Sequence, residues 1–337
     1  MNDIINNLGV VIPVWNRECI LTQTLDSVLN QTRLPYQVVV VDDGSTDGTA
    51  DVVAVWQKKK SPAFRFDYVF QKNAGVSVAR NRGAEILENC SHVAFLDSDD
   101  MWPADFVESA LKDFEVYGNE IVLWSRNHAK YDAQTGDLDP QYIKSFNDIY
   151  PAVKRAFYLN HLPILSGTVV RLRDHFAVNG FRAGMLTGQD RDWMLKMARG
   201  GKWVLTSGAP VYFRRDYQAI KRKNSDHLSH LNQQKAEWQI ARPATHEFYL
   251  MEHLADSMLS HNECAGRLAE LWKHAGREYL KKAHKQYGRW CYERAARIER
   301  KGPFLLLLGN YKLFGVKAQN PGGWLASRLL PDPVLPQ

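Results

Sequence analysis

The sequence has few cysteines, no long apolar run and no excess of acidic residues, and each absence narrows what the protein can be. The cysteines lack the spacing of metal ligands, so we expect reduced thiols, with neither a zinc site nor a disulfide framework; they are Cys19, Cys90, Cys264 and Cys291. No apolar stretch approaches the roughly 20 residues that a membrane-spanning helix needs. The first seven residues also lack the basic and apolar regions of a signal peptide. We therefore expect a cytoplasmic protein.

The composition is that of an ordinary globular chain with a basic balance. Its 337 residues are 45% hydrophobic and 24% charged, which is enough to bury one large core or two smaller ones. A net charge of +6 and a pI near 9.0 fit an anionic partner. That partner could be a nucleotide, an acidic lipid or a nucleic acid, and charge alone does not distinguish them. Nucleic acid is the least expected, because the basic residues are not interleaved with an aromatic platform.

The chain opens with alternating strand and helix patterns. The β-branched run from Leu8 to Val14 predicts a strand, and apolar residues spaced near i, i+4 and i+8 between Glu18 and Gln31 predict an amphipathic helix. The Gly-x-Gly-x-x-Gly turn of a dinucleotide fold is absent between them. A second buried strand, Val38 to Val41, ends at Asp42 and Asp43. These acids could accept hydrogen bonds from a ribose or base, or belong to the cap of the next helix.

The segment around residue 95 organises the rest. His92 to Leu96 predicts a buried strand, and Asp97, Asp99 and Asp100 follow it directly, where open α/β sheets bind ligands. Carboxylates this close together repel one another, and Mg²⁺ or Mn²⁺ relieves the repulsion while leaving coordination sites for phosphate oxygens. The pattern thus indicates a metal that holds a nucleoside diphosphate. A solvated acidic turn that caps the helix after Pro103 would explain the same residues.

A glycine loop precedes this strand and leads into a predicted helix that contains two arginines. Arg80 and Arg82 are two residues apart, so on a helix they point about 200° apart and cannot both face one ligand. We expect Arg80 to serve the ligand and Arg82 to face solvent or play a structural part.

Four motifs in this region resemble those of family 2 glycosyltransferases in their order and spacing, and the resemblance covers about the first 215 residues. The motifs are Val11 to Arg17, Val41 to Thr49, Asn73 to Gly83, and Phe95 to Asp100. The resemblance implies an α/β fold of the GT-A type, Rossmann-like, with a nucleotide-sugar half and an acceptor half. It also implies inverting transfer of a sugar from a nucleotide-sugar donor.

The resemblance assigns roles residue by residue. The residues implied to line the nucleoside pocket are Pro13, Trp15, Asn16, Asp43 and Arg80. Asp97 would approach the ribose, and Asp99 would be the principal ligand of the Mg²⁺ or Mn²⁺ cofactor. Trp15 departs from the commoner Tyr or Phe, but another flat ring should still stack on a base.

A later helix pattern, with acids before apolar positions 194, 195, 197 and 198, carries the implied base. Matching the family pattern makes Asp190 the catalytic base and puts Gln189 where Glu is usual, which removes one negative charge from beside the base. N-capping and helix-dipole complementation by Asp190 and Asp192 are the structural alternative.

The remaining predictions concern the acceptor half and the C-terminal region. We expect these elements: strands at Glu120 to Trp124, Pro163 to Val170 and Val211 to Asp216, a hairpin at Tyr131 to Asp139, and a short helix at Pro151 to Asn160. Ser166 and Gly167 could let the backbone approach a sugar, or form a bulge. We expect the GT-A domain over residues 1–225, with a basic loop at residues 217–230, and a helical appendage over residues 226–337. Its apolar stripes are Phe248 to Leu259, Cys264 to Tyr279, and Tyr287 to Ile298.

The last segment, from Lys301 to Leu330, mixes apolar, aromatic and basic residues and is too short to span a membrane. It could make a peripheral membrane contact at the inner face of the cell membrane, or a homodimer contact.

Three functions remain open at this point. The leading one is an inverting glycosyltransferase of surface polysaccharide biosynthesis, which uses a UDP-sugar and a glycan or lipid-linked acceptor. The second is a sugar-nucleotide-binding protein with little or no transfer activity, motivated by Gln189. The third, a nucleotidyltransferase, would need a glycine-rich phosphate-binding signature that Pro13 to Arg17 does not supply.

Overall fold

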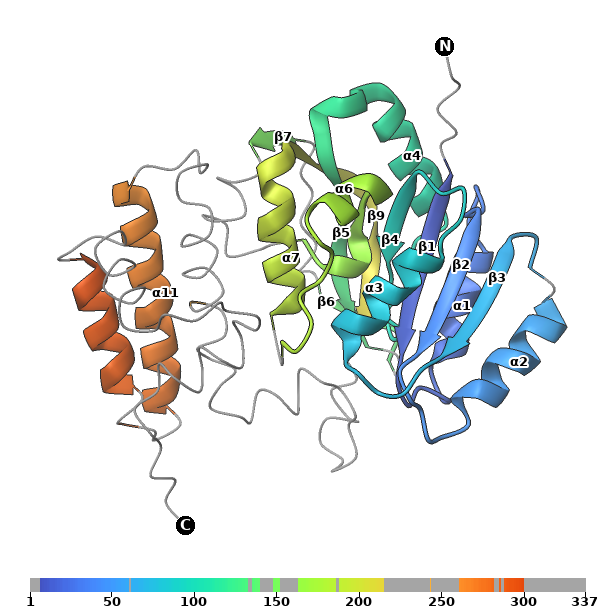
Figure 1. The fold of residues 1–337 in the computed structure, drawn as a ribbon, viewed down its shortest axis with the longest axis horizontal. Coiled ribbons are helices and arrows are strands. Elements are labelled where there is room, and N and C mark those ends of the chain that lie inside the picture. The colour runs from blue at the N-terminus through green and yellow to red at the C-terminus, as the bar shows by residue number, and fades with distance from the viewer. Residues whose placement is uncertain are drawn as a thin grey trace. The chain divides into compact units, whose positions relative to one another are not determined.

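The computed structural model describes residues 7–60, 62–132, 135–139, 148–151, 163–185, 188–214, 243, 261–281, 285 and 288–299. They belong to two compact units (Figure 1). The first unit comprises Met1–Ala152, His161–Phe181 and Gly200–Ser225, and the second comprises Val153–Asn160, Arg182–Arg199 and Asp226–Gln337.

The described part of the first unit is built on a nine-stranded sheet. The strands are β1 (Leu8–Val14), β2 (Gln37–Asp42), β3 (Arg65–Phe70), β4 (His92–Phe95), β5 (Ile121–Tyr131), β6 (Leu138–Asp139), β7 (Asp148–Pro151), β8 (Thr168–Arg171) and β9 (Lys202–Arg214). Their order is β3-β2-β1-β4-β8-β5-β9-β7, and β6 pairs with β5. The predicted strand at residues 120–124 falls in the longer β5 except for Glu120, which belongs to the 3₁₀ helix η1 (Gly118–Glu120), and that at residues 211–216 falls in the longer β9 up to Arg214, with residues 215–216 outside the described residues; the predicted hairpin is the β5–β6 pair.

The first four strands are parallel, and their connectivity reverses at β1. The chain runs outward from β1 to β2 and β3, then returns to place β4 on the other side of β1. In sheets of this kind the crevice for ligands opens at the carboxyl ends of the strands that flank the reversal. The loops after β1 and β4 meet this edge, and they contain the motifs Trp15 to Arg17 and Asp97 to Asp100.

Helices cover both faces of this sheet. One face packs against α1 (Leu21–Leu29), α2 (Thr49–Lys60) and α4 (Phe106–Tyr117), and the other against α3 (Val76–Ile86) and α6 (Leu172–Ala177). Figure 1 shows α3 in front of β1, with α1 behind the sheet. Both faces of β1 and β2 are therefore buried, which explains why these strands read as continuous apolar runs.

Helix α3 lies unusually close to β1, and a glycine permits this. A Cβ at Gly83 would lie 2.3 Å from Cγ1 of Val11, which is nearer than two carbon atoms can approach. Alternate residues of β1, Val10 and Ile12, face the opposite layer and its core. The glycine thus fixes the depth at which α3 sits on the sheet.

One predicted strand is shorter than expected. Within the range Pro163 to Val170, residues Leu165–Gly167 form the short 3₁₀ helix η3, and only the end of the range belongs to β8. The turn is held by close packing, because a Cβ at Gly167 would lie 3.1 Å from the carbonyl oxygen of Arg126. The strand β7 and the helix α6 were not predicted. Pro151 ends β7, and the rest of the predicted helix, residues 152–160, lies outside the described residues.

In the second unit the structure describes α7 (Gln189–Met197), α11 (His261–Lys281) and a helical stretch at residues 288–299. Cys264, Leu268, Leu271, Ala275 and Tyr279 are all buried, as the predicted stripe requires. The rings of Trp272 and Trp290 meet edge to face at 5.2 Å, so α11 packs against the following helical stretch. The predicted stripe at residues 248–259, the basic loop at residues 217–230 and the segment from residue 301 onward lie outside the described residues.

The described helices include none that is both long and apolar enough to cross a membrane. All four cysteines are free thiols, as expected. Burial raises the pKa of Cys90 to about 11 and that of Cys291 to about 12, so these two thiols are unreactive near neutral pH.

Candidate active site

The loop after β1 is fastened to the loop after β2 through Asn16. The backbone N–H of Asn16 donates to Oγ of Ser45 at 2.9 Å, and its side-chain Oδ1 accepts the N–H of Thr46 at 2.8 Å. Asn16 has a φ of 52°, a left-handed conformation in which asparagine is favoured over most side chains. Trp15, half-buried, follows Pro13 and Val14 out of β1. These contacts fix the predicted nucleoside-binding residues of this loop at the carboxyl edge of the sheet.

Asp43 organises the glycine loop that precedes α3. Its carboxylate accepts three hydrogen bonds, from Nε2 of Gln71 at 2.7 Å and from the backbone N–H groups of Ala74 and Gly75, both at 2.8 Å. The residue is only 4% exposed, so these donors stabilise a buried negative charge. Asp43 therefore connects the end of β2 to the beginning of α3.

Arg80 and Arg82 diverge, as their spacing predicts. Nη2 of Arg80 lies 2.6 Å from Oδ1 of Asp97, and the guanidinium stacks 5.2 Å from the ring centre of Phe181. Arg82 instead reaches Oε1 of Gln71 at 3.4 Å. Arg80 is only 6% exposed, whereas the side chain of Asp97 is 34% exposed, so the arginine is buried and the carboxylate still reaches solvent. The structure thus brings together two predicted site residues from α3 and from the loop after β4.

Each of the carboxylates after β4 has a different kind of partner. Asp97 pairs with Arg80, and Oδ2 of Asp99 lies 4.0 Å from Nη2 of Arg17. Asp100 is almost completely buried, and it accepts hydrogen bonds from Oγ of Ser166 at 2.5 Å and from the backbone N–H of Arg214 at 3.2 Å. Burial, with a smaller contribution from the two nearby carboxylates, raises the pKa of Asp100 well above its ordinary value.

The donor set around Asp99 fits a divalent ion that takes further ligands from a substrate. Among the residues that the structure describes, no three His, Cys, Asp or Glu side chains gather as a metal site. Mg²⁺ commonly binds through one or two carboxylates together with the phosphates of a nucleotide. Asp99 meets this requirement, because it lies at the edge of the sheet and its side chain is 14% exposed, whereas Asp100 is occupied by Ser166 and Arg214.

Asp190 belongs to the second unit, in the first turn of α7. It is exposed, and its Oδ1 accepts the backbone N–H of Arg191 at 2.8 Å. The N-cap of α7 is Gly188, in the left-handed conformation, so neither Asp190 nor Asp192 is the N-cap residue. Burial lowers the pKa of Arg191, and the nearby Arg267 adds to this while Asp190 opposes it. The carboxylate of Asp190 thus keeps an open side.

The neighbours of Asp190 have structural contacts. Nε2 of Gln189 donates to the backbone carbonyl of Met185 at 2.8 Å, a bond that an ionised glutamate could not make. Asp192 is 2% exposed and lies between Arg182 and Lys196, at 3.5 Å and 3.6 Å. The acid two positions beyond the predicted base is therefore a buried, doubly paired charge.

Two residues at the carboxyl edge have partners that the sequence did not reveal. Oγ of Ser166 donates to Asp100 and also accepts the backbone N–H of Asp97 at 3.1 Å, so this hydroxyl spans the acidic motif. Arg17 supplies the cation beside Asp99. A basic residue in the turn after β1, next to a strand that ends in acids, was the only sequence signal for that contact.

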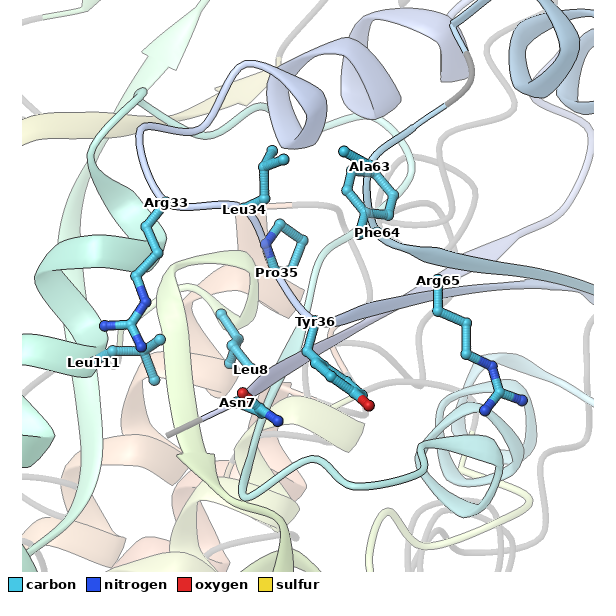
Figure 2. Close-up of a pocket in the computed structure, with 10 residues that line it drawn as sticks. All are labelled: Asn7, Leu8, Arg33, Leu34, Pro35, Tyr36, Ala63, Phe64, Arg65 and Leu111. Carbon is cyan, nitrogen blue, oxygen red and sulfur yellow. The ribbon is translucent and has the colours of Figure 1, made fainter. Parts of the chain in front are cut away.

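A cavity of about 440 Å³ lies at the amino ends of β1, β2 and β3, at the edge opposite the acidic motif (Figure 2). Its lining mixes apolar residues, among them Leu8, Leu34 and Phe64, with polar groups, and the guanidinium groups of Arg33 and Arg65 lie at its sides (Figure 2). Arg33 pairs with Glu115 at 3.8 Å and Arg65 pairs with Glu88. Because it lies at the other edge of the sheet, this cavity is separate from the candidate active site.

Comparisons with known proteins support the fold and the family. A family described as "Glycosyl transferase family 2" matches residues 9–176. The putative teichuronic acid biosynthesis glycosyltransferase TuaG of Bacillus subtilis is 37% identical over 106 residues, which are 31% of this chain and 40% of TuaG. The chain spans only 25–29% of the length of the first curated relatives that it matches.

Solved structures agree in fold at low sequence identity. The S. aureus TarS fragment 1-349 in complex with UDP-GlcNAc has a TM-score of 0.55 and 16% identity, covering 86% of this chain and 92% of that chain. The mannosyltransferase PcManGT from Pyrobaculum calidifontis, in complex with GDP-Man and Mn²⁺, has a TM-score of 0.53 and 17% identity, covering 95% of this chain and 83% of that chain.

The family match begins in β1 and ends in α6. It therefore includes the loops after β1 and β2, the glycine loop before α3 and the acidic motif, while Asp190 lies beyond it. The sheet, with its reversal at β1 and helices on both faces, is the GT-A fold that the sequence predicts. Through this domain, the chain belongs to glycosyltransferase family 2.

Proposed function

We propose that this protein is an inverting glycosyltransferase that moves a sugar from a nucleotide-sugar donor, most readily a UDP-sugar, to a hydroxyl of a glycan or lipid-linked acceptor. The observation that carries the proposal is the assembly of three loops, after β1, β2 and β4, at the reversal of the sheet. Asn16 joins the loops after β1 and β2 directly, while Asp43 binds the glycine loop before α3 and Asp97 binds Arg80 on α3. In open α/β sheets this is the position at which nucleotides bind.

For donor binding, we propose a role for each predicted residue. The indole of Trp15 would stack on the base, next to Pro13, while Asn16 would hold the loop that carries it. Asp97, held by Arg80, would accept a hydrogen bond from a ribose hydroxyl. Preorganised partners of this kind lower the cost of ordering the site when the nucleotide arrives.

For metal binding, we propose Asp99 as the principal protein ligand. When bound there, Mg²⁺ or Mn²⁺ would supply the positive charge that neutralises the departing diphosphate. The support is the carboxylate of Asp99 at the carboxyl edge of the sheet, its position beside two other acids, and the Mn²⁺ named with the solved mannosyltransferase.

For activation of the acceptor, we propose Asp190 as the catalytic base. An acceptor hydroxyl is a poor nucleophile near neutral pH, and Asp190 would take its proton as the oxygen attacks the anomeric carbon. A single displacement of this kind inverts that carbon and needs no covalent intermediate on the protein. The exposed carboxylate on the first turn of α7 is suited to this role, because only one of its oxygens is engaged by the backbone N–H of Arg191.

The biological setting is part of the proposal as well. The name of TuaG, with its teichuronic acid, supports a place in surface polysaccharide biosynthesis. We infer action on the cytoplasmic side of the cell membrane, where nucleotide sugars are made. Peripheral membrane contact or dimerisation through residues 301–330 stays a prediction, because that segment lies outside the described residues.

The test is a screen of nucleotide sugars for binding, hydrolysis and transfer with Mg²⁺ or Mn²⁺, using the wild type, Asp190→Asn and Asp99→Asn. We expect Asp190→Asn to bind the donor normally while transfer falls by about 10²–10⁴-fold. Asp99→Asn should weaken metal-dependent binding. Equal transfer by Asp190→Asn and the wild type would refute the base. Binding without hydrolysis or transfer by the wild type, over a broad acceptor panel, would favour the sugar-nucleotide-binding alternative.

A further inference from the structure

Two arginines face the acidic motif, and they hold it in different ways. Arg80 meets Asp97 at 2.6 Å, which is a short hydrogen-bonded ion pair. Arg17 stands 4.0 Å from Asp99, which is too far for a hydrogen bond but close enough for electrostatic attraction. The Arg80 pair is therefore a fixed part of the fold, whereas the Arg17 pair lacks the directional bond that would lock it.

The position of Arg17 is set by its own loop and does not depend on Asp99. Its backbone N–H donates to Oγ1 of Thr49 at 2.9 Å, and its Nη1 donates to the carbonyl oxygens of Asn16 and Trp15 at 3.0 Å and 3.3 Å. These contacts keep the positive charge at the carboxyl edge of β1. The guanidinium would stay near the site even if Asp99 took another partner.

Both members of the pair are largely buried, so their electrostatic attraction is strong enough to oppose metal binding at Asp99. The side chains of Arg17 and Asp99 are 12% and 14% exposed. At this depth the effective dielectric constant lies well below that of water, and a 4 Å separation is worth several times its value in bulk solvent. A metal ion that binds Asp99 must replace this attraction and must also approach a fixed positive charge.

We propose that Arg17 is a built-in counter-cation of Asp99 that strengthens the cooperativity between metal binding and nucleotide binding. This inference rests on the proposed function, because it takes Asp99 as the metal ligand and a nucleoside diphosphate as the donor. Without nucleotide, Arg17 competes with the metal for Asp99. With nucleotide bound, the guanidinium of Arg17 pairs with the negatively charged diphosphate instead. Arg17 then no longer competes with the metal for Asp99, and the metal and Arg17 both attract the diphosphate.

The experiment measures Mn²⁺ affinity by electron paramagnetic resonance of the free ion, with and without UDP or GDP, on the full chain. In the wild type we expect nucleotide to tighten Mn²⁺ binding by about tenfold or more. In Arg17→Gln, Mn²⁺ alone should bind several-fold more tightly than to the wild type, and the nucleotide should tighten Mn²⁺ binding by a several-fold smaller factor than in the wild type, because coordination by the phosphates remains. Arg17→Met, which keeps an apolar stem of similar reach, is the second variant and should behave alike.

Arg33→Gln is the matched control, since it removes the same charge from the opposite edge of the sheet and should bind Mn²⁺ like the wild type. Arg17→Gln or Arg17→Met with unchanged Mn²⁺ affinity and unchanged nucleotide effect would overturn the inference. Asp99→Asn separates this failure from that of the proposed function. If Asp99→Asn loses Mn²⁺ while the Arg17 variants match the wild type, only the inference falls; if Asp99→Asn binds Mn²⁺ normally, the metal assignment falls with it.

Discussion

Oγ of Ser166, on η3, donates a hydrogen bond to the buried carboxylate of Asp100 across 2.5 Å, while the same oxygen accepts the backbone N–H of Asp97. The two acids lie in the loop after β4, and 66 residues of sequence separate Asp100 from Ser166. One hydroxyl thus supports both ends of the acidic motif from the neighbouring part of the sheet.

Replacing this hydroxyl should destabilise the protein and disturb the site. In Ser166→Ala the buried Asp100 and the N–H of Asp97 each lose a partner, so we expect a loss of about 1–3 kcal/mol in the free energy of unfolding. Urea denaturation measures this loss. Ser109→Ala is the control, because Ser109 bonds only to the half-exposed Asp105 and should change stability by less than about 1 kcal/mol. Equal stabilities of the two variants would contradict the role of Ser166.

Asp43 should matter for both stability and nucleotide binding. Asp43→Asn keeps the shape but replaces one accepting oxygen by an N–H₂ donor, which would face N–H groups that now donate to Asp43. We expect a loss of about 1–3 kcal/mol in unfolding free energy and weaker binding of UDP by calorimetry. Asp51→Asn, an exposed acid on α2, serves as the control. Wild-type UDP affinity together with wild-type stability in Asp43→Asn would be the contrary result.

We expect Gln189 to stabilise the fold and not to limit the rate of transfer. In Gln189→Glu a carboxylate would face the carbonyl oxygen of Met185, which now accepts the amide N–H₂. We therefore expect the family-like residue to lower the unfolding free energy by about 1–2 kcal/mol without increasing transfer. Thermal denaturation and initial rates test the two halves separately. A variant that is both as stable and faster would show that the glutamine limits catalysis.

The stability of the fold should depend on pH through His92. Burial, followed by repulsion from Arg171 and Arg173, lowers the pKa of His92 to about 4, from an ordinary value of 6.5. Between these values the unfolded chain binds the proton and the folded chain does not, so acid favours unfolding. The contribution is fully present above pH 6.5 and is lost as the pH falls toward 4. We expect it to cost about 2 kcal/mol between pH 7.5 and pH 5.

His92→Phe tests this dependence. The ring of His92 packs against that of Phe114 at 4.4 Å in a tilted arrangement, so phenylalanine preserves much of the packing, although the contact with Oγ of Ser91 at 2.8 Å is lost. Urea denaturation of both proteins at the two pH values gives the comparison. The variant should lose about 2 kcal/mol less than the wild type over this interval. Parallel pH profiles would exclude His92 as the source.

The parallel part of the sheet, β1 to β4, could be predicted from the sequence because its signals are local. Each buried parallel strand is an apolar run, and the strands that begin at Leu8, Gln37 and His92 lie within a residue of their predicted starts. Likewise, Arg80 and Arg82 diverge because two helical positions must. Asn16, Asp43 and Asp97 all lie at the carboxyl edge of the sheet, because the order and direction of the strands alone determine where the loops after them lie.

The partners of the site residues could not be predicted, because they depend on long-range packing. Nothing in the pattern Pro163 to Val170 shows that Ser166 bonds to Asp100 or that Gly167 lies against the carbonyl of Arg126. The roles of Gln71 and Arg17 have the same origin, since each is a polar residue whose partner lies on a different loop. Sequence periodicity identifies elements, while these contacts require the assembled sheet.

The contact between Gly83 and Val11 links the architecture to the chemistry. Gly83 lies one helical turn after Arg80, so the seating of α3 on the sheet also sets how far the guanidinium of Arg80 stands from Asp97. A methyl group at Gly83 would overlap Val11, so the helix or the strand would have to shift to accommodate it. The distance within the Arg80–Asp97 pair, at the proposed nucleotide site, therefore depends on a position that carries no side chain, on the buried side of the helix.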